Sequence, residues 1–186
     1  FDRFSHGRKD HIAVWGDGNL GYITSLFLRY RYPDAKLYIM GVNRDKLTGF
    51  SFADETFDVR EIPDDIVIDH AFECVGGTGA PKAIDQIIDH IRPEATIGIL
   101  GVSENPVPVN TRMILEKGLR VFGSSRSGRQ DFISTIEMFT EHPEMVALMK
   151  NIVGDVVDVR SIEDMHTAFQ KDIAKAGGKT IMLWNV

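Results

Sequence analysis

The chain has 186 residues, of which 43% are hydrophobic and 26% are charged, and its formal net charge at pH 7 is −6. This composition is typical of a soluble globular protein and argues against disorder or a fibrous structure. The negative balance argues against a broad basic surface, so we expect no binding to nucleic acid or to a membrane. Cys74 is the only cysteine, which excludes an intrachain disulfide and favours a cytoplasmic protein.

Patterns typical of strands and helices alternate along the chain, which predicts a parallel sheet covered by helices on both faces. Strands are expected at residues 11–15, 36–40, 57–59, 66–73, 96–100 and 120–123. Helices are expected at residues 20–32, 45–50, 80–91, 113–116 and 130–142. Past residue 151 the pattern changes to a strand at 156–159, a helix at 162–172 and a strand at 180–184. We interpret this tail as a fragment of a second domain.

A G-x-G-x-x-G motif, formed by Gly16, Gly18 and Gly21, lies between the first predicted strand and the first predicted helix. There the first glycine permits a tight turn, the second lets the backbone approach a pyrophosphate, and the third allows the helix to pack closely on the strand. The amides at the helix start, around Asn19 and Leu20, are expected to face the phosphates. The motif predicts a Rossmann-type dinucleotide site, with a purely structural turn as the alternative.

Residues at the end of the second strand determine whether such a domain prefers NAD or NADP. An acidic residue there would bind the ribose 2′-hydroxyl of NAD. Here the chain has Asn43 and Arg44, followed by Asp45 and Lys46. The guanidinium of Arg44 suits a 2′-phosphate, and Lys46 would add a point charge. We therefore expect NADP rather than NAD. The alternatives are that Arg44 is a solvated surface residue, or that Asp45 serves the ribose.

Three further strand ends carry glycine or small polar residues. Val75 and Gly76 follow the fourth strand, and Gly101 and Val102 follow the fifth. Because ligands bind at the carboxyl ends of parallel strands, these residues are expected to line the cofactor groove, with ordinary tight strand exits as the alternative. The run from 123 to 129 offers hydroxyls, amides and a guanidinium at the end of the sixth strand, either for a phosphate or carboxamide or as a solvated loop.

Two kinds of site are not expected in this chain. Cys74 ends an apolar strand, so we predict a buried, inert thiol rather than a nucleophile. The histidines show no spacing typical of a metal site, and we assign no metal to the chain.

With these features placed, the chain resembles the medium-chain alcohol dehydrogenase superfamily from residue 12 nearly to its end. The resemblance rests on residues 16–21, 41–42, 69–76, 98–102 and 178–180. Within the superfamily it looks most like the ribitol-5-phosphate dehydrogenases, or ribulose-5-phosphate reductases, of teichoic-acid and capsule precursor synthesis. Residues 51–57, 101–104, 110–113 and 123–128 carry this closer likeness.

The resemblance implies roles for residues of this chain. The three glycines of the motif would contact the pyrophosphate, and Asn43 would stand where NAD-specific members have an aspartate. Val75, Gly101 and Val102 would border the ribose and the nicotinamide. Ser124 and Arg126 would lie near the carboxamide or the substrate, and Lys179 would reach the pyrophosphate from the terminal strand.

The resemblance also implies a domain organisation. Residues 1–154 are expected to form a Rossmann domain with a doubly wound parallel six-stranded sheet. Residues 155–186 are expected to be the C-terminal segment of a catalytic domain whose N-terminal part, with the zinc ligands, is absent from this sequence. Family members pair through the outer strand of the sheet, so a homodimer is expected.

We therefore predict the NADP(H)-binding portion of a zinc-type dehydrogenase that transfers hydride between NADPH and a sugar-phosphate ketone. The ketone is expected to be that of ribulose 5-phosphate, which the zinc would polarise as a Lewis acid. No catalytic residue is assigned, and the 186 residues alone are expected to be inactive. The alternatives are a non-catalytic nucleotide-sensing module and a methyltransferase. Asn43 and Arg44 argue against the latter, which needs an acidic residue at their position.

Overall fold

The computed structural model describes residues 1, 7–174 and 177–185. Contacts within the chain divide it into two compact units, Phe1–Ser127 and Gly128–Val186, which are described separately. This division comes earlier than residue 154, where we expected the Rossmann domain to end, because the predicted helix after residue 128 groups with the C-terminal tail. The assignment of residues 155–186 to a catalytic domain remains a prediction.

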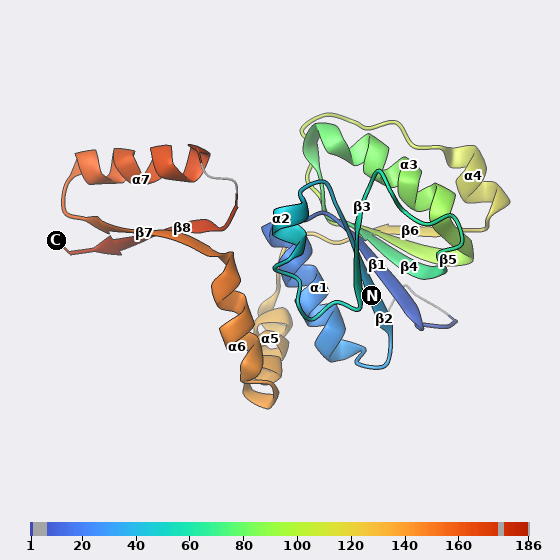
Figure 1. Ribbon diagram of the computed structural model, residues 1–186, viewed down its shortest axis with the longest axis horizontal. Coiled ribbons are helices and arrows are strands. Elements are labelled where there is room, and N and C mark those ends of the chain that lie inside the picture. The colour runs from blue at the N-terminus through green and yellow to red at the C-terminus, as the bar shows by residue number, and fades with distance from the viewer. Residues whose placement is uncertain (2–6, 175–176, 186) are drawn as a thin grey trace. The chain divides into compact units, whose positions relative to one another are not determined.

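The first unit contains a six-stranded sheet in the order β3-β2-β1-β4-β5-β6 (Figure 1). All five neighbouring pairs are parallel, which confirms the Rossmann-type sheet. The strands are β1 (His11–Trp15), β2 (Lys36–Gly41), β3 (Glu55–Asp58), β4 (Ile68–Glu73), β5 (Ile91–Ile99) and β6 (Arg120–Gly123). The order reverses between β1 and β4, and such a switch point leaves a crevice at the carboxyl ends of the two strands.

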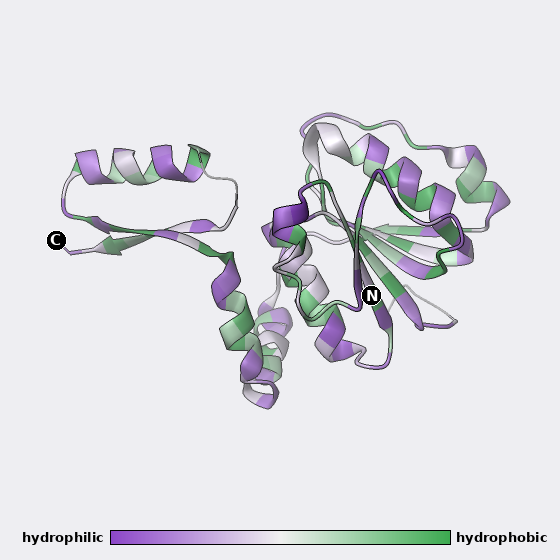
Figure 2. Ribbon diagram, in the orientation of Figure 1, coloured by the Kyte–Doolittle hydropathy of each residue, from purple (hydrophilic) through white to green (hydrophobic). Residues whose placement is uncertain are grey.

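The helices of this unit lie on both faces of the sheet (Figure 1). They are α1 (Asn19–Arg31), α2 (Arg44–Leu47), the 3-10 turn η1 (Gly77–Gly79), α3 (Ala80–His90) and α4 (Thr111–Glu116). α3 buries Ala83, Ile84, Ile87 and Ile88, whose spacing puts them on one face of the helix. Hydrophobic and hydrophilic bands accordingly alternate along α3 in Figure 2. The apolar face packs with Ala13 of β1 and its neighbours into a hydrophobic core cluster.

Most predicted elements agree with the structure to within a few residues, and β5 shows the largest difference. It begins at Ile91 rather than at residue 96, and its register with β4 is irregular between Ile68 and His70. The early part contains Pro93, which lacks an amide donor, and Glu94, whose φ is 62°. These residues obscured the strand pattern in the sequence.

The second unit consists of α5 (Arg129–Glu141), α6 (Glu144–Met149), the 3-10 turn η2 (Lys150–Ile152), β7 (Val153–Val159), α7 (Ile162–Ala174) and β8 (Lys179–Trp184). β7 and β8 pair in parallel, which confirms the predicted strand-helix-strand tail. α6 was not predicted. Pro143, which ends α5 in the sequence pattern, is the N-cap of α6, and proline is well tolerated at a helix start.

Candidate functional site at the carboxyl edge of the sheet

The turn between β1 and α1 has two glycines that the packing itself requires. Gly16 has a φ of 128°, and a Cβ there would lie 2.9 Å from the carbonyl oxygen of Cys74. A Cβ on Gly21 would collide with the carbonyl oxygen of Gly16. A side chain at either position would force the helix away from the strand. The structure thus shows the turning and close-packing roles expected of the first and third glycines.

Gly18 is different, because nothing in the described protein requires it to be glycine. Its backbone is extended, with φ −89° and ψ −175°, a conformation that any residue adopts. A Cβ on Gly18 would meet no described heavy atom within 4 Å. Gly18 is the N-cap of the 13-residue helix α1, so the space beside it is the place where a helix start attracts an anion. We therefore expect a diphosphate to approach at this corner.

The motif is tied to the end of β2 by Asp17. Its Oδ2 accepts hydrogen bonds from the amides of Val42 at 2.8 Å and Asn43 at 2.7 Å. A Cβ on Gly41 would lie 2.8 Å from the Asp17 carboxylate, so Gly41 permits this close approach. Asp17 was not singled out in the sequence, because it occupies a variable position of the motif. Its carboxylate fixes the position of the glycine turn, residues 16–21, relative to the end of β2.

Asn43 acts locally as a helix cap. Its side-chain oxygen accepts a hydrogen bond from the amide of Lys46 at 3.1 Å at the start of α2. An aspartate could cap the helix equally well, but here the position carries no charge. The absence of a carboxylate at residue 43 removes the group that would repel a 2′-phosphate.

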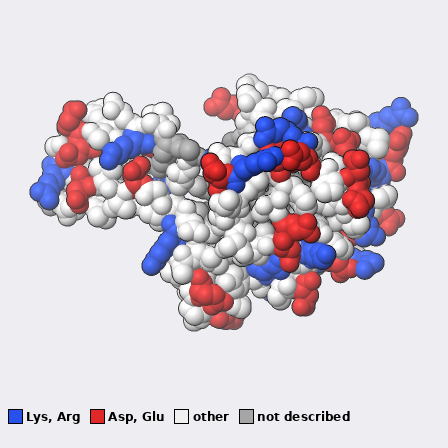
Figure 3. All heavy atoms as spheres, in the orientation of Figure 1, with Lys and Arg blue, Asp and Glu red and all other residues white. Residues whose placement is uncertain are grey.

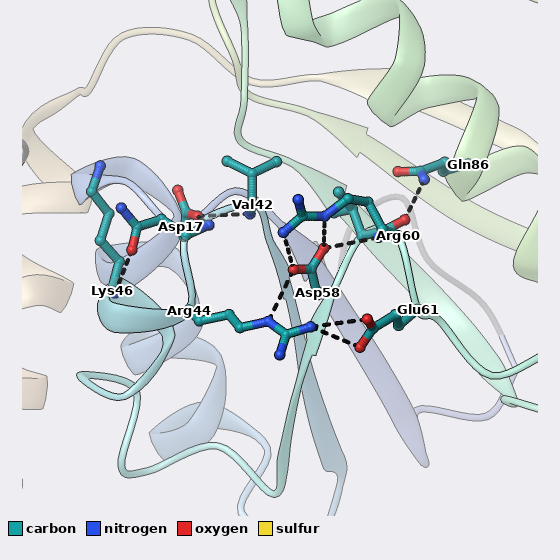
Figure 4. Close-up of polar contacts among 10 residues, drawn as sticks. Asp17, Val42, Arg44, Lys46, Asp58, Arg60, Glu61 and Gln86 are labelled. Atoms are coloured by element: carbon teal, nitrogen blue, oxygen red, sulfur yellow. Dashed lines mark hydrogen bonds and ion pairs between the residues drawn. The ribbon is translucent and has the colours of Figure 1, made fainter.

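Arg44 follows the cap and is held by two carboxylates (Figure 4). Its Nε lies 3.3 Å from Oδ2 of Asp58, and its Nη2 donates to both carboxylate oxygens of Glu61 at 2.9 Å. Arg44 is therefore exposed but ordered by ion pairs, rather than simply solvated. The side chain of Lys46 extends from α2 in a different direction (Figure 4). The structure does not bring the two predicted cations together.

The carboxylate of Asp58, at the end of β3, also binds Arg60. The Arg60 Nε donates to Oδ1 at 2.7 Å, and its Nη2 donates to Oδ2. Hydrogen bonds from the side chain and then the backbone amide of Arg60, with a smaller one from Arg44, hold the pKa of Asp58 well below its usual range. Sequence reasoning missed Asp58, Arg60 and Glu61, although the charged run directly after the third strand was the available signal.

The ends of β4 and β5 are joined by Glu73, which is buried. Its Oε1 accepts from the amides of Val75 at 2.8 Å and Gly76 at 2.7 Å, and its Oε2 accepts from Gly101 at 3.2 Å. Gly76 has a φ of 65°, and a Cβ there would lie 2.6 Å from the carbonyl oxygen of Val102. The two predicted strand ends therefore lie against each other. Glu73 belongs to the quoted family resemblance, but its role was not predicted.

Large apolar side chains are exposed along this edge of the sheet. They belong to Leu20, Val42, Val75 and Val102. They come from the start of α1 and from the segments that follow β2, β4 and β5. Exposed apolar residues beside polar backbone groups are typical of a groove for an organic ligand. Their contact with the cofactor remains a prediction.

The remaining predicted cofactor residues lie in two places. Ser124 follows β6, where its amide donates to the carbonyl of Ile99 at 3.4 Å, and Arg126 is exposed with a φ of 68°. Lys179 begins β8 in the second unit. Their predicted contacts with the carboxamide, the substrate and the pyrophosphate remain predictions.

The thiol of Cys74 is buried behind the glycine turn, as predicted. Burial is the main cause that raises the pKa of Cys74 to about 12, while a hydrogen bond to Oγ1 of Thr24 at 3.7 Å acts in the opposite direction. Within residues 1, 7–174 and 177–185, His, Cys, Asp and Glu form no group of three or more that could hold a metal ion. Likewise, no helix in this part of the chain is long and apolar enough to cross a membrane.

Comparison with known proteins identifies the family. The model of a family described as zinc-binding dehydrogenase matches residues 34–141. This chain belongs to the zinc-binding dehydrogenases. The resemblance to zinc-type medium-chain dehydrogenases is thereby confirmed.

Ribulose-5-phosphate reductases are among the similar proteins. The enzyme from Bacillus spizizenii is 48% identical over 186 residues, which is 100% of this dehydrogenase chain and 54% of that protein. The enzyme from Streptococcus pneumoniae is 43% identical over 182 residues, covering 98% of this chain and 52% of the other. The crystal structure of S. aureus TarJ in complex with NADPH has a TM-score of 0.93 and 46% identity, covering 96% of this chain and 56% of that one. The chain spans about half the length of these relatives.

Proposed function

We propose that the chain is the NADPH-binding portion of a reductase that converts a sugar-phosphate ketone, ribulose 5-phosphate, to ribitol 5-phosphate. The single observation that carries the proposal is the open space at Gly18, beside the start of α1 and at the switch point of the sheet. Support for the substrate comes from the similar ribulose-5-phosphate reductases and for the cofactor from TarJ, which binds NADPH.

In this proposal the amides at the start of α1 receive the pyrophosphate, with the helix dipole favouring its charge. Asp17 holds the end of β2 against this turn, so that the adenosine ribose meets a fixed backbone. Val75 and Val102 offer apolar contacts to the rest of the cofactor. When bound, NADPH supplies the hydride, and the role of this chain is to hold and orient it.

The preference for the 2′-phosphorylated cofactor is assigned to Arg44. Asn43 is neutral, so position 43 itself carries no carboxylate that would oppose a phosphate. Arg44 is 66% exposed, and its exposed ion pair with Glu61 is of a kind that contributes little, so the guanidinium is available for exchange. A phosphate would be a stronger partner than a single carboxylate.

Residues 155–186 are assigned to the catalytic domain of the parent enzyme. Their helix α7 and strand β8 expose large apolar side chains that a second domain would cover, including Ile162, Phe169, Ile173, Leu183 and Trp184. The zinc expected for the family is assigned to the N-terminal catalytic domain, and we derive no step through it.

The localisation, the biosynthetic role and the oligomeric state are proposed from the same similarity to ribulose-5-phosphate reductases. We propose that the enzyme is cytoplasmic and supplies precursors for teichoic acid or capsule. We also propose a homodimer formed through β6, which is the last strand of the sheet order and exposes Val121. Acidic and basic side chains are interspersed on the face of the molecule in Figure 3, with no broad basic field of the kind that binds nucleic acid or a membrane.

Two measurements test the proposal. Titration with NADPH and NADH should show tighter binding of NADPH, and Arg44→Ala should remove most of the difference. The full-length protein should oxidise NADPH when ribulose 5-phosphate is added, whereas the 186 residues alone should not. Cofactor binding without any turnover by the full-length protein would instead favour a nucleotide-sensing module. Binding of S-adenosylmethionine in place of NADPH would favour a methyltransferase.

A further inference from the structure

Arg60 is an exposed cation beside the proposed cofactor site. It follows β3, which pairs with β2 so that Asp58 lies opposite Gly41. The ends of β2 and β3 are therefore neighbours at the same edge of the sheet. Arg60 comes from the β3 end and Arg44 from the segment after β2.

One carboxylate fixes the positions of both guanidinium groups (Figure 4). Oδ2 of Asp58 accepts from Nη2 of Arg60 and lies 3.3 Å from Nε of Arg44. The Asp58 side chain is only 4% exposed, whereas each arginine is 66% exposed. A buried anion thus holds two exposed cations side by side, each anchored at its inner edge.

Each guanidinium keeps donors for another partner. Arg60 uses Nε and Nη2 toward Asp58, and Arg44 uses Nε toward Asp58 and Nη2 toward Glu61. Among the described residues, Nη1 of neither arginine makes a hydrogen bond. Guanidinium groups anchored on one side are well suited to bind an oxyanion on the other, because little side-chain entropy remains to be lost.

We propose that Arg60 is a second ligand for the 2′-phosphate of NADPH, acting with Arg44 on the common anchor Asp58. This inference rests on the proposed function, because it requires a 2′-phosphorylated cofactor at the β2 end. A phosphate monoester carries a charge close to −2 near neutral pH, which one arginine does not balance. Asp58 already offsets one guanidinium charge, so Arg44 alone would offer the phosphate no net positive charge. Arg44 and Arg60 together offer one net positive charge once the phosphate has taken the place of Glu61.

Because Glu61 is exposed, replacing its carboxylate at Arg44 by a phosphate costs little free energy. Its side chain is 68% exposed, and the partner Arg44 is also mostly exposed. Such ion pairs contribute little to stability, so the phosphate displaces a weakly held carboxylate. Asp58 stays in place because the fold buries it. A surface pocket of about 320 Å³ is lined by Arg44, Asp58 and Glu61 but not by Arg60, so it offers room on the Arg44 side of the cluster.

The test is a set of titrations with NADPH, NADH and 2′,5′-ADP on the wild type, Arg60→Gln and Arg60→Lys. The matched control is Arg112→Gln, which removes an arginine on α4 that also pairs with a carboxylate, that of Glu116. We expect Arg60→Gln to weaken NADPH and 2′,5′-ADP by about tenfold and to leave NADH within about twofold. Arg60→Lys should restore part of the loss because it keeps the charge without the fork.

Two results would overturn the inference. Unchanged affinity for NADPH in Arg60→Gln would show that Arg60 only neutralises Asp58. Equal losses for NADPH and NADH, with a lowered melting temperature, would show a purely structural role. The proposed function fails separately: if the wild type binds NADH as tightly as NADPH, both proposals are wrong. If Arg44→Ala removes the preference and Arg60→Gln does not, only the role of Arg60 is wrong.

Discussion

A Cβ atom at position 101 would lie 2.6 Å from both carboxylate oxygens of Glu73. Glu73 is buried and accepts hydrogen bonds from three backbone amides at the ends of β4 and β5. The carboxylate can take this position only because residue 101 has no side chain. The two strand ends are thus held by a relationship between one glycine and one acid that are far apart in the sequence.

Gly101→Ala is therefore expected to destabilise the fold. The added methyl would also collide with the amide nitrogen of Gly76, so it would push apart the β4 and β5 ends as well as displace the Glu73 carboxylate. We expect a loss of about 2 kcal/mol or more in the free energy of unfolding. Urea unfolding of the variant and the wild type measures this loss of free energy. The control is Gly123→Ala at the end of β6, where the nearest atom to a Cβ is the Ile99 carbonyl oxygen at 3.9 Å. Equal effects of the two substitutions would contradict the role given to Glu73.

Gly18→Ala is expected to separate binding from stability. The backbone at residue 18 accepts alanine and the Cβ would meet no described atom, so the unfolding free energy should fall by no more than about 1 kcal/mol, the usual cost of alanine at an N-cap. The methyl would stand where the pyrophosphate approaches the amides, and NADPH should bind about tenfold more weakly. Titration and thermal unfolding of the same protein measure both effects.

The chain offers a matched control for that substitution. Gly128 is also the extended N-cap of a 13-residue helix, α5, and Gly128→Ala should have the same small effect on stability without weakening NADPH. Gly21→Ala should do the opposite of Gly18→Ala and unfold the protein, because its Cβ would collide with Gly16. Unchanged NADPH affinity in Gly18→Ala would remove the main support for the pyrophosphate site.

Glu61→Gln should strengthen the binding of NADPH. The Glu61 carboxylate accepts hydrogen bonds from Nη2 of Arg44, and removing its charge makes that donor available to the phosphate. An exposed ion pair contributes up to about 1 kcal/mol, so we expect a gain of about threefold for NADPH and none for NADH. Titrations at low and high salt should show the gain shrinking as salt screens the pair. A gain that is equal for both cofactors would argue against competition at Arg44.

The Cys74 thiol should stay unreactive in the native protein across the ordinary pH range. Burial raises the pKa of Cys74 to about 12 from the usual 9.0, so the folded state disfavours the thiolate. The linked stability is complete below pH 9 and is lost as the pH rises toward 12. Alkylation with iodoacetamide should be slow at pH 8 and become fast in denaturant. Rapid native alkylation at pH 8 would contradict the burial of this thiol.

Agreement between sequence and structure was best where the signal is local. The turn at residues 16–21 and the apolar face of α3 follow from spacing within one element, and both are present in the structure. The irregular start of β5 and the short helix α6 were missed, because Pro93 and Pro143 interrupt the periodic patterns on which prediction relies. The site residues predicted from strand ends do lie at one edge of the sheet.

Contacts between distant parts of the chain were the main omission. The sequence indicated a free guanidinium at Arg44, but the structure shows it paired with Glu61 and Asp58. Glu73 was visible only as part of a strand, although it anchors two strand ends. These roles depend on the order of the strands in the sheet. The hydrophobic periodicity of the sequence does not indicate which strands are neighbours.

The sequence by itself determined the alternating architecture, the glycine turn and the uncharged residue at position 43, because each depends on conformational rules that act within a few residues. Only the tertiary structure decided that the ends of β2 and β3 are neighbours and that Arg44 and Arg60 share the Asp58 carboxylate. The physical reason is that parallel pairing places residues far apart in the chain at one edge of the sheet, where burial selects which charges must be matched.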